Sequence, residues 1–263
     1  MKIHFIGIDG VGMSFLAKLC EDFADVDGSD IKRKGHKAEF VAGADLVVKS
    51  MAITDDNPEI VEAKKEGLPI VDRASLLGVI MDSYGKKIAV SGTHGKTTAT
   101  AMIAYALRSL EPTAAIGGSI GGKVGIVGKK KVFVAEACEY KRSFLHLNPT
   151  IGVILNADFD HVDYYRSLSD VQSAFREFAD KCETALIGED IKRFGIKGRK
   201  QTLIFGFTDD CDYVGKIDND ILFLLRNGVV KDSVRLKVRG KHNYYDALAA
   251  LAGGGFFWGG GGV

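Results

Sequence analysis

Short apolar runs alternate with amphipathic stretches along most of the chain, and the two kinds of stretch predict different elements. The apolar runs are nearly continuous, as in strands that are buried on both faces of a parallel sheet. The amphipathic stretches repeat their apolar residues at the spacing of a helix with one buried face. Strands are therefore expected at 2–8, 44–50, 68–73, 86–92, 131–137 and 150–157, and helices at 13–23, 57–67, 97–110 and 168–182.

The alternation of strand and helix starts twice, once at Lys2 and once near Lys86. Such a rhythm is typical of parallel sheets that are covered by helices. We therefore predict two α/β domains, at 1–84 and 85–252, with the boundary in the polar stretch near 83–86. Ser169 or Asp170 is expected to cap the helix at 168–182.

The region 198–240 has a different pattern, with short strand-like runs and turns such as Asn227-Gly228. This pattern predicts an antiparallel or mixed edge to the second domain. The stretch 253–263 contains mainly glycine and three adjacent aromatic residues. Because glycine loses the most conformational entropy on ordering, no packed element is expected there.

The composition allows a buried core and excludes several classes of protein. Apolar residues make up 46% of the 263 residues, and the net charge is +1, so no broad surface for nucleic acid or membrane is expected. No apolar run reaches about 18 residues, and the first apolar run is too short for a signal peptide. The four cysteines form no Cys-x-x-Cys pair. Reduced thiols in a cytoplasmic protein are therefore the expectation.

A glycine-rich turn follows the strand expected at 86–92 and leads into a helix. It consists of Gly92, Thr93, His94, Gly95, Lys96, Thr97 and Thr98. Such a turn is the setting of a phosphate-binding loop, because backbone N–H groups and the helix N-terminus attract phosphate oxygens. Lys96 would reach the β- and γ-phosphates, and the hydroxyl of Thr97 would bind Mg²⁺. Val90 replaces the usual first glycine, so this is a variant loop; a glycine-rich turn with a solvated lysine is the alternative.

The variant loop resembles that of the Mur ligase family, ATP-dependent enzymes that build the peptide stem of the bacterial cell wall. Further segments follow in that family's order: HFIGIDGVGMS (4–14), VDGSD (26–30), KSMAITDDNPEI (49–60), IGGSI (116–120), VAEACEYKRSFLHLNP (134–149), NADFDHVDYY (156–165) and RGKHNYYDALAA (239–250). The resemblance covers roughly 1–252. It implies a Rossmann-like UDP-sugar-binding domain and a central P-loop-type ATPase domain with a mostly parallel sheet. The segments are most similar to the branch that joins L-alanine to UDP-N-acetylmuramate through an acyl phosphate, with ATP and Mg²⁺.

The resemblance also implies roles for individual residues. It assigns the binding of ATP phosphates and Mg²⁺ to Lys96 and Thr97, and an acidic metal ligand to Glu136. It assigns His161 to a second metal ion or to the γ-phosphate, and it makes Lys96, Glu136 and His161 the catalytic residues. It assigns adenine contacts to His242 and Asn243, beside the loop residues 92–98. It assigns the UDP-sugar site to Gly10, Gly12, Ser29, Asp30 and Ser50.

Some of these residues have simpler interpretations. A solvated acidic turn is the alternative for 158–163, and a surface patch is the alternative for Glu139, Tyr140 and Arg142. Cys138 is expected to be a packed thiol, since ligation through an acyl phosphate needs no nucleophilic side chain. The glycines of the segment 4–14, taken alone, indicate only a dinucleotide-type fold.

The chain departs from the family's pattern in four places. Asp9 stands where the family has glycine, and its carboxylate would repel a diphosphate unless it points away. The stretch 24–48 is shorter than the family's and lacks a helix–strand piece. Asp246 replaces an asparagine near the adenine. After Ala252 the family continues into a third domain that carries the amino-acid site, so a fragment or incomplete form is expected, with a partner chain as one possible source of that domain.

Three functions remain open at this point. The first is the alanine-adding ligase, and the second is a non-catalytic module that binds ATP or a UDP-sugar. The third is another ligase of this type, such as a murein tripeptide ligase or a folylpolyglutamate-type enzyme. The segment 136–147 and the UDP-type N-terminal domain favour the first over the folate branch.

Overall fold

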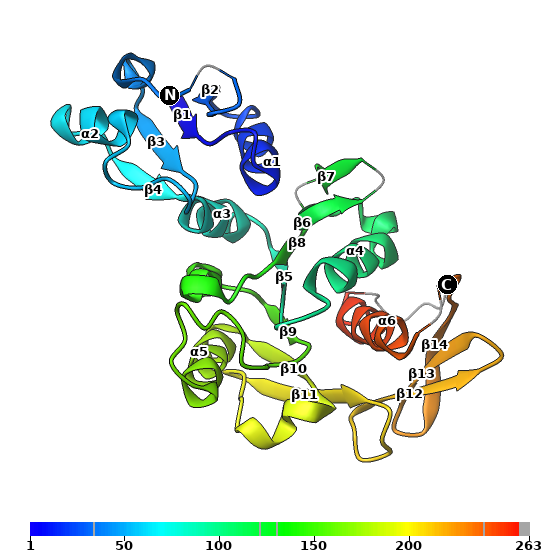
Figure 1. The fold of residues 1–263 in the computed structure, drawn as a ribbon. Coiled ribbons are helices and arrows are strands. Elements are labelled where there is room, and N and C mark those ends of the chain that lie inside the picture. Colours follow the sequence, from blue (N-terminus) through cyan, green and yellow to red (C-terminus); the bar gives the residue numbers. More distant parts are fainter. Residues whose placement is uncertain (34, 121, 130, 239, 258–263) are drawn as a thin grey trace.

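The structure is a computed structural model that describes residues 1–33, 35–120, 122–129, 131–238 and 240–257. Its strands form two sheets, which lie in the two regions separated by the stretch 83–85 (Figure 1). The fold is therefore α/β with mainly parallel sheets, as the alternation of strands and helices predicts.

The first sheet has four parallel strands in the order β2-β1-β3-β4. The strands are β1 Lys2–Ile6, β2 Asp25–Ser29, β3 Leu46–Lys49 and β4 Ile70–Asp72. The connections contain α1 Val11–Cys20, the 3-10 helix η1 Ala38–Val41, α2 Pro58–Lys65 and α3 Arg73–Asp82. Because the strands are parallel, their carboxyl ends meet at one edge of the sheet, where ligands bind in folds of this kind.

The second sheet has ten strands in the order β14-β13-β12-β11-β10-β9-β5-β8-β6-β7. Its core is parallel, and β7, β13 and β14 are antiparallel to their neighbours, as expected for a mixed edge. The strands are β5 Lys86–Ser91, β6 Thr113–Ile120, β7 Lys123–Ile126, β8 Val132–Glu136, β9 Ile151–Ile154, β10 Thr184–Gly188, β11 Gln201–Gly206, β12 Tyr213–Asp218, β13 Ile221–Arg226 and β14 Val229–Arg235. The helices are α4 Lys96–Ala106, η2 Arg108–Leu110, η3 Tyr140–His146, α5 Leu168–Lys181, η4 Glu189–Phe194 and α6 Lys241–Gly254.

Side chains of the second sheet alternate between two apolar clusters. Ile88 and Val90 of β5 lie in the cluster that contains α4 and α6, whereas Ala89 lies in the cluster that contains α5. Helices α4 and α6 lie side by side on their face of the sheet (Figure 1). This placement sets the start of α6 beside the loop that begins α4.

Helix α3 joins the two regions, because it packs against η3. A Cβ on Gly78 would lie 2.2 Å from the carbonyl oxygen of His146, so only glycine permits this approach. The side-chain amide of Asn148 donates a hydrogen bond to Asp82 over 2.9 Å. The apolar cluster around α5 also includes residues of α1 and α3, so the two regions share one core.

Two expectations about helix ends are wrong. Ser167 caps α5 by accepting a 3.2 Å hydrogen bond from the N–H of Asp170, so the expected caps, Ser169 and Asp170, lie inside the first turn. Helix α6 continues to Gly254, although no packed element was expected from residue 253 onward. A Cβ on Gly253 would lie 3.2 Å from Val153 of β9, so this glycine permits close packing. The remainder of that stretch, 258–263, lies outside the described residues.

The sequence interpretation also missed α3, the β6–β7 hairpin and β10. All four cysteines are free thiols in the described part of the chain, as expected. None of the helices in the described ranges is long and apolar enough to cross a membrane.

The contact at Gly78 generates a prediction in which two effects oppose each other. In a free helix, Gly78→Ala would stabilise by about 1 kcal/mol through helix propensity. Here the added methyl group meets a backbone carbonyl, so we expect a net loss of about 1–3 kcal/mol in the free energy of unfolding, measured by urea denaturation. The control is Gly85→Ala, whose methyl group would enter open space. A stability gain in Gly78→Ala would show that α3 does not approach η3 this closely.

Candidate functional site

The glycine-rich loop between β5 and α4 is held from one side by Asn156. The N–H of His94 donates to the side-chain oxygen of Asn156 over 2.8 Å, and the Asn156 amide donates to the carbonyl of His94 over 3.0 Å. The N–H of Asp158 donates to the hydroxyl of Thr93 over 2.8 Å. Gly95 ends the loop with φ 83°, in the left-handed region that favours glycine.

These hydrogen bonds determine which backbone N–H groups of the loop are available to an anion. The N–H groups of Thr93 and His94 are both directed to Asn156, at 3.4 and 2.8 Å. The first turn of a helix has N–H groups without helical partners, so Lys96, Thr97 and Thr98 present the donors that remain for phosphate oxygens. The sequence interpretation did not identify Asn156 as a residue that holds the loop. The sequence points to Asn156 only as the first residue of the family-like segment 156–165.

Lys96 lies folded over its own loop. Its Nζ donates to the carbonyls of Gly92 over 2.7 Å and Thr93 over 3.1 Å. It also pairs with the carboxylate of Glu139, at 3.2 Å from Oε1 and 3.1 Å from Oε2. The loop lysine is therefore shared between two backbone carbonyls and one buried carboxylate.

Glu139 is buried, with 2% of its surface exposed, so its interpretation as part of a surface patch is wrong. The hydroxyl of Tyr165 donates to its carbonyl over 2.6 Å. Nε2 of His161 lies 3.4 Å from its carboxylate. The other members of that patch do pair on the outside: Arg142 with Asp170 and Glu177, and Tyr140 with Asp163.

Glu136, at the end of β8, meets the first turn of α4. The hydroxyl of Thr97 donates to Glu136 over 2.7 Å, and the N–H of Gly117 donates to the same oxygen over 3.0 Å. A hydroxyl and a carboxylate oxygen suit Mg²⁺, which usually takes one or two carboxylates together with substrate phosphates. His161 lies beside Glu139 instead, with its Nε2 3.4 Å from that carboxylate. Its expected contact with a second metal ion or with the γ-phosphate stays a prediction. The described ranges contain no cluster of three or more His, Cys, Asp or Glu residues that could hold a metal ion.

The start of α6 borders the loop from the other side. The side chain of Asp246 lies 2.5 Å from the position that a Cβ on Gly95 would occupy. His242 and Asn243, the expected adenine contacts, lie one turn earlier, and His242 is exposed. Asp246 is 6% exposed, and burial raises the pKa of its carboxyl to about 7.

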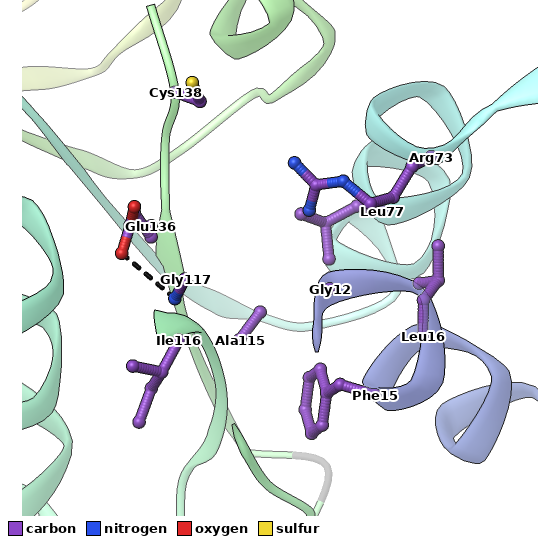
Figure 2. A pocket seen from close by; sticks show the side chains of 10 residues that line it. All are labelled: Gly12, Phe15, Leu16, Arg73, Leu77, Ala115, Ile116, Gly117, Glu136 and Cys138. Atoms are coloured by element: carbon purple, nitrogen blue, oxygen red, sulfur yellow. Dashed lines mark hydrogen bonds between the residues drawn. The ribbon is translucent and has the colours of Figure 1, made fainter. Parts of the chain in front are cut away.

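A cavity of about 300 Å³ separates the two regions beside Glu136 (Figure 2). One wall comes from α1 and α3, and the other from β6 and the end of β8. The lining residues are Gly12, Phe15, Leu16, Arg73, Leu77, Ala115, Ile116, Gly117, Glu136 and Cys138. The hydrogen bond from Thr97 to Glu136 therefore connects the loop to this cavity.

The residues expected at the UDP-sugar site gather at the carboxyl edge of the first sheet. Gly10 is the N-cap of α1, and Ser50 directly follows β3 beside Gly7. The carbonyl of Ser29 accepts from the N–H groups of Gly7 and Ile8 at 2.8 and 3.0 Å.

Two of these side chains are occupied within the protein. The hydroxyl of Ser29 is buried and donates to Glu59 over 2.7 Å. The carboxylate of Asp30 accepts from the N–H of Asp9 at 3.2 Å and of Lys32 at 3.0 Å. The uridine contacts expected of these side chains would have to use the acceptor positions that these bonds leave open.

The repulsion expected from Asp9 is reduced by a partner. Arg33 approaches both carboxylate oxygens of Asp9, at 2.5 and 2.7 Å. The Arg33 side chain is 63% exposed, so the pair is screened by solvent. Asp9 therefore presents a paired charge to the edge of the sheet.

Fold and site together define a two-domain α/β protein with a phosphate-type loop at the domain interface. A family model described as Mur ligase middle domain matches residues 90–254, and one described as Mur ligase family, catalytic domain, matches residues 2–84. The chain belongs to the Mur ligase family.

Individual relatives are consistent with this assignment. The chain is 41% identical to a UDP-N-acetylmuramate–L-alanine ligase of Caldanaerobacter subterraneus subsp. tengcongensis, over 95% of this chain and 62% of the relative. It is 31% identical to the solved UDP-N-acetylmuramate–alanine ligase of Thermotoga maritima, with a TM-score of 0.79, over 96% of this chain and 64% of that one. The chain thus spans less than two thirds of the length of these relatives.

Burial of Asp246 leads to a prediction about pH. Its carboxyl has a pKa of about 7 when folded and an ordinary low value when unfolded. The folded state therefore holds the proton more tightly, and stability falls as pH rises from about 4 to about 7. Asp246→Asn removes this charge, so we expect it to stabilise by about 2 kcal/mol more at pH 8.5 than at pH 5 in urea denaturation.

The exposed Asp25 provides the control, since Asp25→Asn removes the same charge at the surface. An equal effect of Asp246→Asn at both pH values would show that Asp246 does not titrate in this range.

Proposed function

We propose that the chain forms the nucleotide-binding part of an ATP-dependent ligase that joins L-alanine to UDP-N-acetylmuramate. In this proposal residues 92–98 bind ATP, and the carboxyl edge of the first sheet binds the UDP-sugar. The observation that carries the proposal is the hydrogen bond from Thr97 to Glu136, because it puts the phosphate-type loop at the wall of the interdomain cavity. The names of the relatives add the substrates.

The proposed reaction has two steps. The carboxylate of UDP-N-acetylmuramate attacks the γ-phosphate of ATP, ADP leaves, and an acyl phosphate forms. The amine of L-alanine then attacks the acyl carbon and displaces phosphate. The first step brings negative oxygens together, and the second develops negative charge on the oxygen of the attacked carbonyl. Fixed positive charge and a site shielded from water therefore favour both steps.

The side chains around the loop have separable tasks in this proposal. Lys96 exchanges its pairing with Glu139 for the β- and γ-phosphates, and Glu139 holds the ammonium group near the loop before ATP binds. Thr97 and Glu136 would hold Mg²⁺ together with phosphate oxygens, and the ion would neutralise the transferred phosphoryl group. His161 would contact the γ-phosphate from the side of Glu139. His242 and Asn243 would contact the adenine.

The biological setting follows from the substrates. Such a ligase acts in the cytoplasm in the synthesis of peptidoglycan precursors, and through them in cell-wall formation, cell shape and division. The boundaries at 1–84 and 85–252 correspond to its UDP-sugar and ATP domains.

Replacement of Lys96 tests the ATP site. Lys96→Ala is expected to weaken Mg²⁺·ATP binding at least about tenfold in calorimetry, since one charge-assisted contact is worth roughly 1.5–3 kcal/mol. Lys129→Ala is the control, because Lys129 is an exposed lysine that pairs with Glu111 away from the loop. Equal ATP affinity of Lys96→Ala and the parent chain would refute the proposed site.

A further inference from the structure

Arg73 is the first residue of α3, and its guanidinium enters the interdomain cavity (Figure 2). Its Nη1 lies 3.0 Å from the position of a Cβ on Gly12, so it lies against the first turn of α1. Within the described residues, Arg73 forms no hydrogen bond and no ion pair, whereas Lys96 is paired with Glu139. The cavity therefore contains a cation whose donors are available.

The surroundings of Arg73 favour an anionic ligand. Five residues of the lining have aliphatic or aromatic side chains: Phe15, Leu16, Leu77, Ala115 and Ile116. The lining carboxylate, Glu136, is already bonded to Thr97 and Gly117. A partly buried guanidinium without hydrogen-bond partners is unfavourable, and an anion in the cavity would relieve that cost.

The side chain of Arg73 extends from α3 towards the opposite wall of the cavity, which carries Glu136 and Cys138 (Figure 2). Burial and the charge of Glu139 raise the pKa of the Cys138 thiol, while the charges of Lys96 and Arg73 act against this rise. Arg73 is thus close enough to act electrostatically on the opposite wall. The close contact of Gly78 with His146 holds α3 against η3, so the backbone that carries Arg73 is fixed in place.

We propose that Arg73 binds the carboxylate of the acid substrate, and that it selects sugar nucleotides which carry this group. The proposal rests on the proposed function, because the carboxylate is the group that must approach the γ-phosphate beside Thr97 and Glu136. The planar fork of an arginine matches a carboxylate with two parallel hydrogen bonds. One carboxylate oxygen forms the new bond to phosphorus while the bond from phosphorus to ADP breaks.

The diphosphate of the sugar nucleotide is the competing anion, since Gly12 lies near Arg73. Two probes separate these possibilities. UDP-N-acetylmuramate and UDP-N-acetylglucosamine share the diphosphate, but only the first has the carboxylate. The affinity ratio of the two therefore reports on the carboxylate alone.

The experiment measures the binding of both sugar nucleotides and of UDP to the parent chain, Arg73→Met, Arg73→Lys and the control Arg108→Met. Arg108 is exposed and lies over the ring of Tyr105, away from the cavity. Arg73→Met is expected to lower the affinity for UDP-N-acetylmuramate about tenfold or more, as for loss of a charge-assisted pair. Its affinities for UDP-N-acetylglucosamine and UDP should stay within about twofold of those of the parent chain. Arg73→Lys keeps the charge but loses the fork, so it should fall between the parent chain and Arg73→Met. Unchanged Mg²⁺·ATP affinity and circular dichroism would show that the variants fold.

Several outcomes would overturn the inference. An equal loss of affinity for all three ligands would show that Arg73 binds the diphosphate. No loss of affinity for any of them would show that Arg73 contacts none of these ligands. Either result, with normal binding by the parent chain, leaves the proposed function standing. Failure of the parent chain to bind any of the uridine nucleotides would overturn the proposed function and this inference together.

Discussion

The hydrogen bond from Thr97 to Glu136 is the interaction on which the rest of the site depends. It joins the first turn of α4, where a helix presents free N–H groups, to the end of β8 at the wall of the interdomain cavity. The parallel order of β5 and β8 makes this possible, because adjacent parallel strands end at the same edge. A phosphate held by the loop and an acid held by the first sheet would therefore meet across one short gap.

Charge around the loop is balanced by burial and pairing. Glu139 lies beneath Lys96 and holds it over the carbonyls of Gly92 and Thr93. Asp246 approaches Gly95 from α6, where burial favours its neutral form. One acidic group is thus paired with a cation, and burial reduces the average negative charge of the other near neutral pH, so less negative charge opposes an anion at the loop.

The sequence predicted those features that depend on local pattern. The buried strands could be predicted because their apolar runs are continuous. The strand–loop–helix around Lys96 could be predicted because glycine, lysine and threonine follow one another directly after an apolar strand. The β6–β7 hairpin was missed because β6 is rich in alanine and glycine, which have little strand preference. Helix α3 was missed because its N-cap, Asp72, was assigned to the strand expected at 68–73.

Features that depend on contacts between distant segments could not be predicted. A surface patch was one interpretation of Glu139, but the glutamate is buried, and the chain turns directly after it at Lys141 and Arg142, both with positive φ. The pairing of Asp9 with Arg33 and the approach of Asp246 to Gly95 arise only when separate elements pack. The local pattern thus identified the loop, whereas packing determined the charges that surround it.

The central claim is that the ATP site and the acid site meet in the interdomain cavity. A crystal structure of the chain with Mg²⁺, a non-hydrolysable ATP analogue and UDP-N-acetylmuramate tests it most directly. The account predicts that a carboxylate oxygen lies between Arg73 and Glu136, about 3–3.5 Å from the γ-phosphorus, as a reactive geometry requires. A sugar nucleotide whose carboxylate lies outside the cavity, with ATP in the loop, would contradict it.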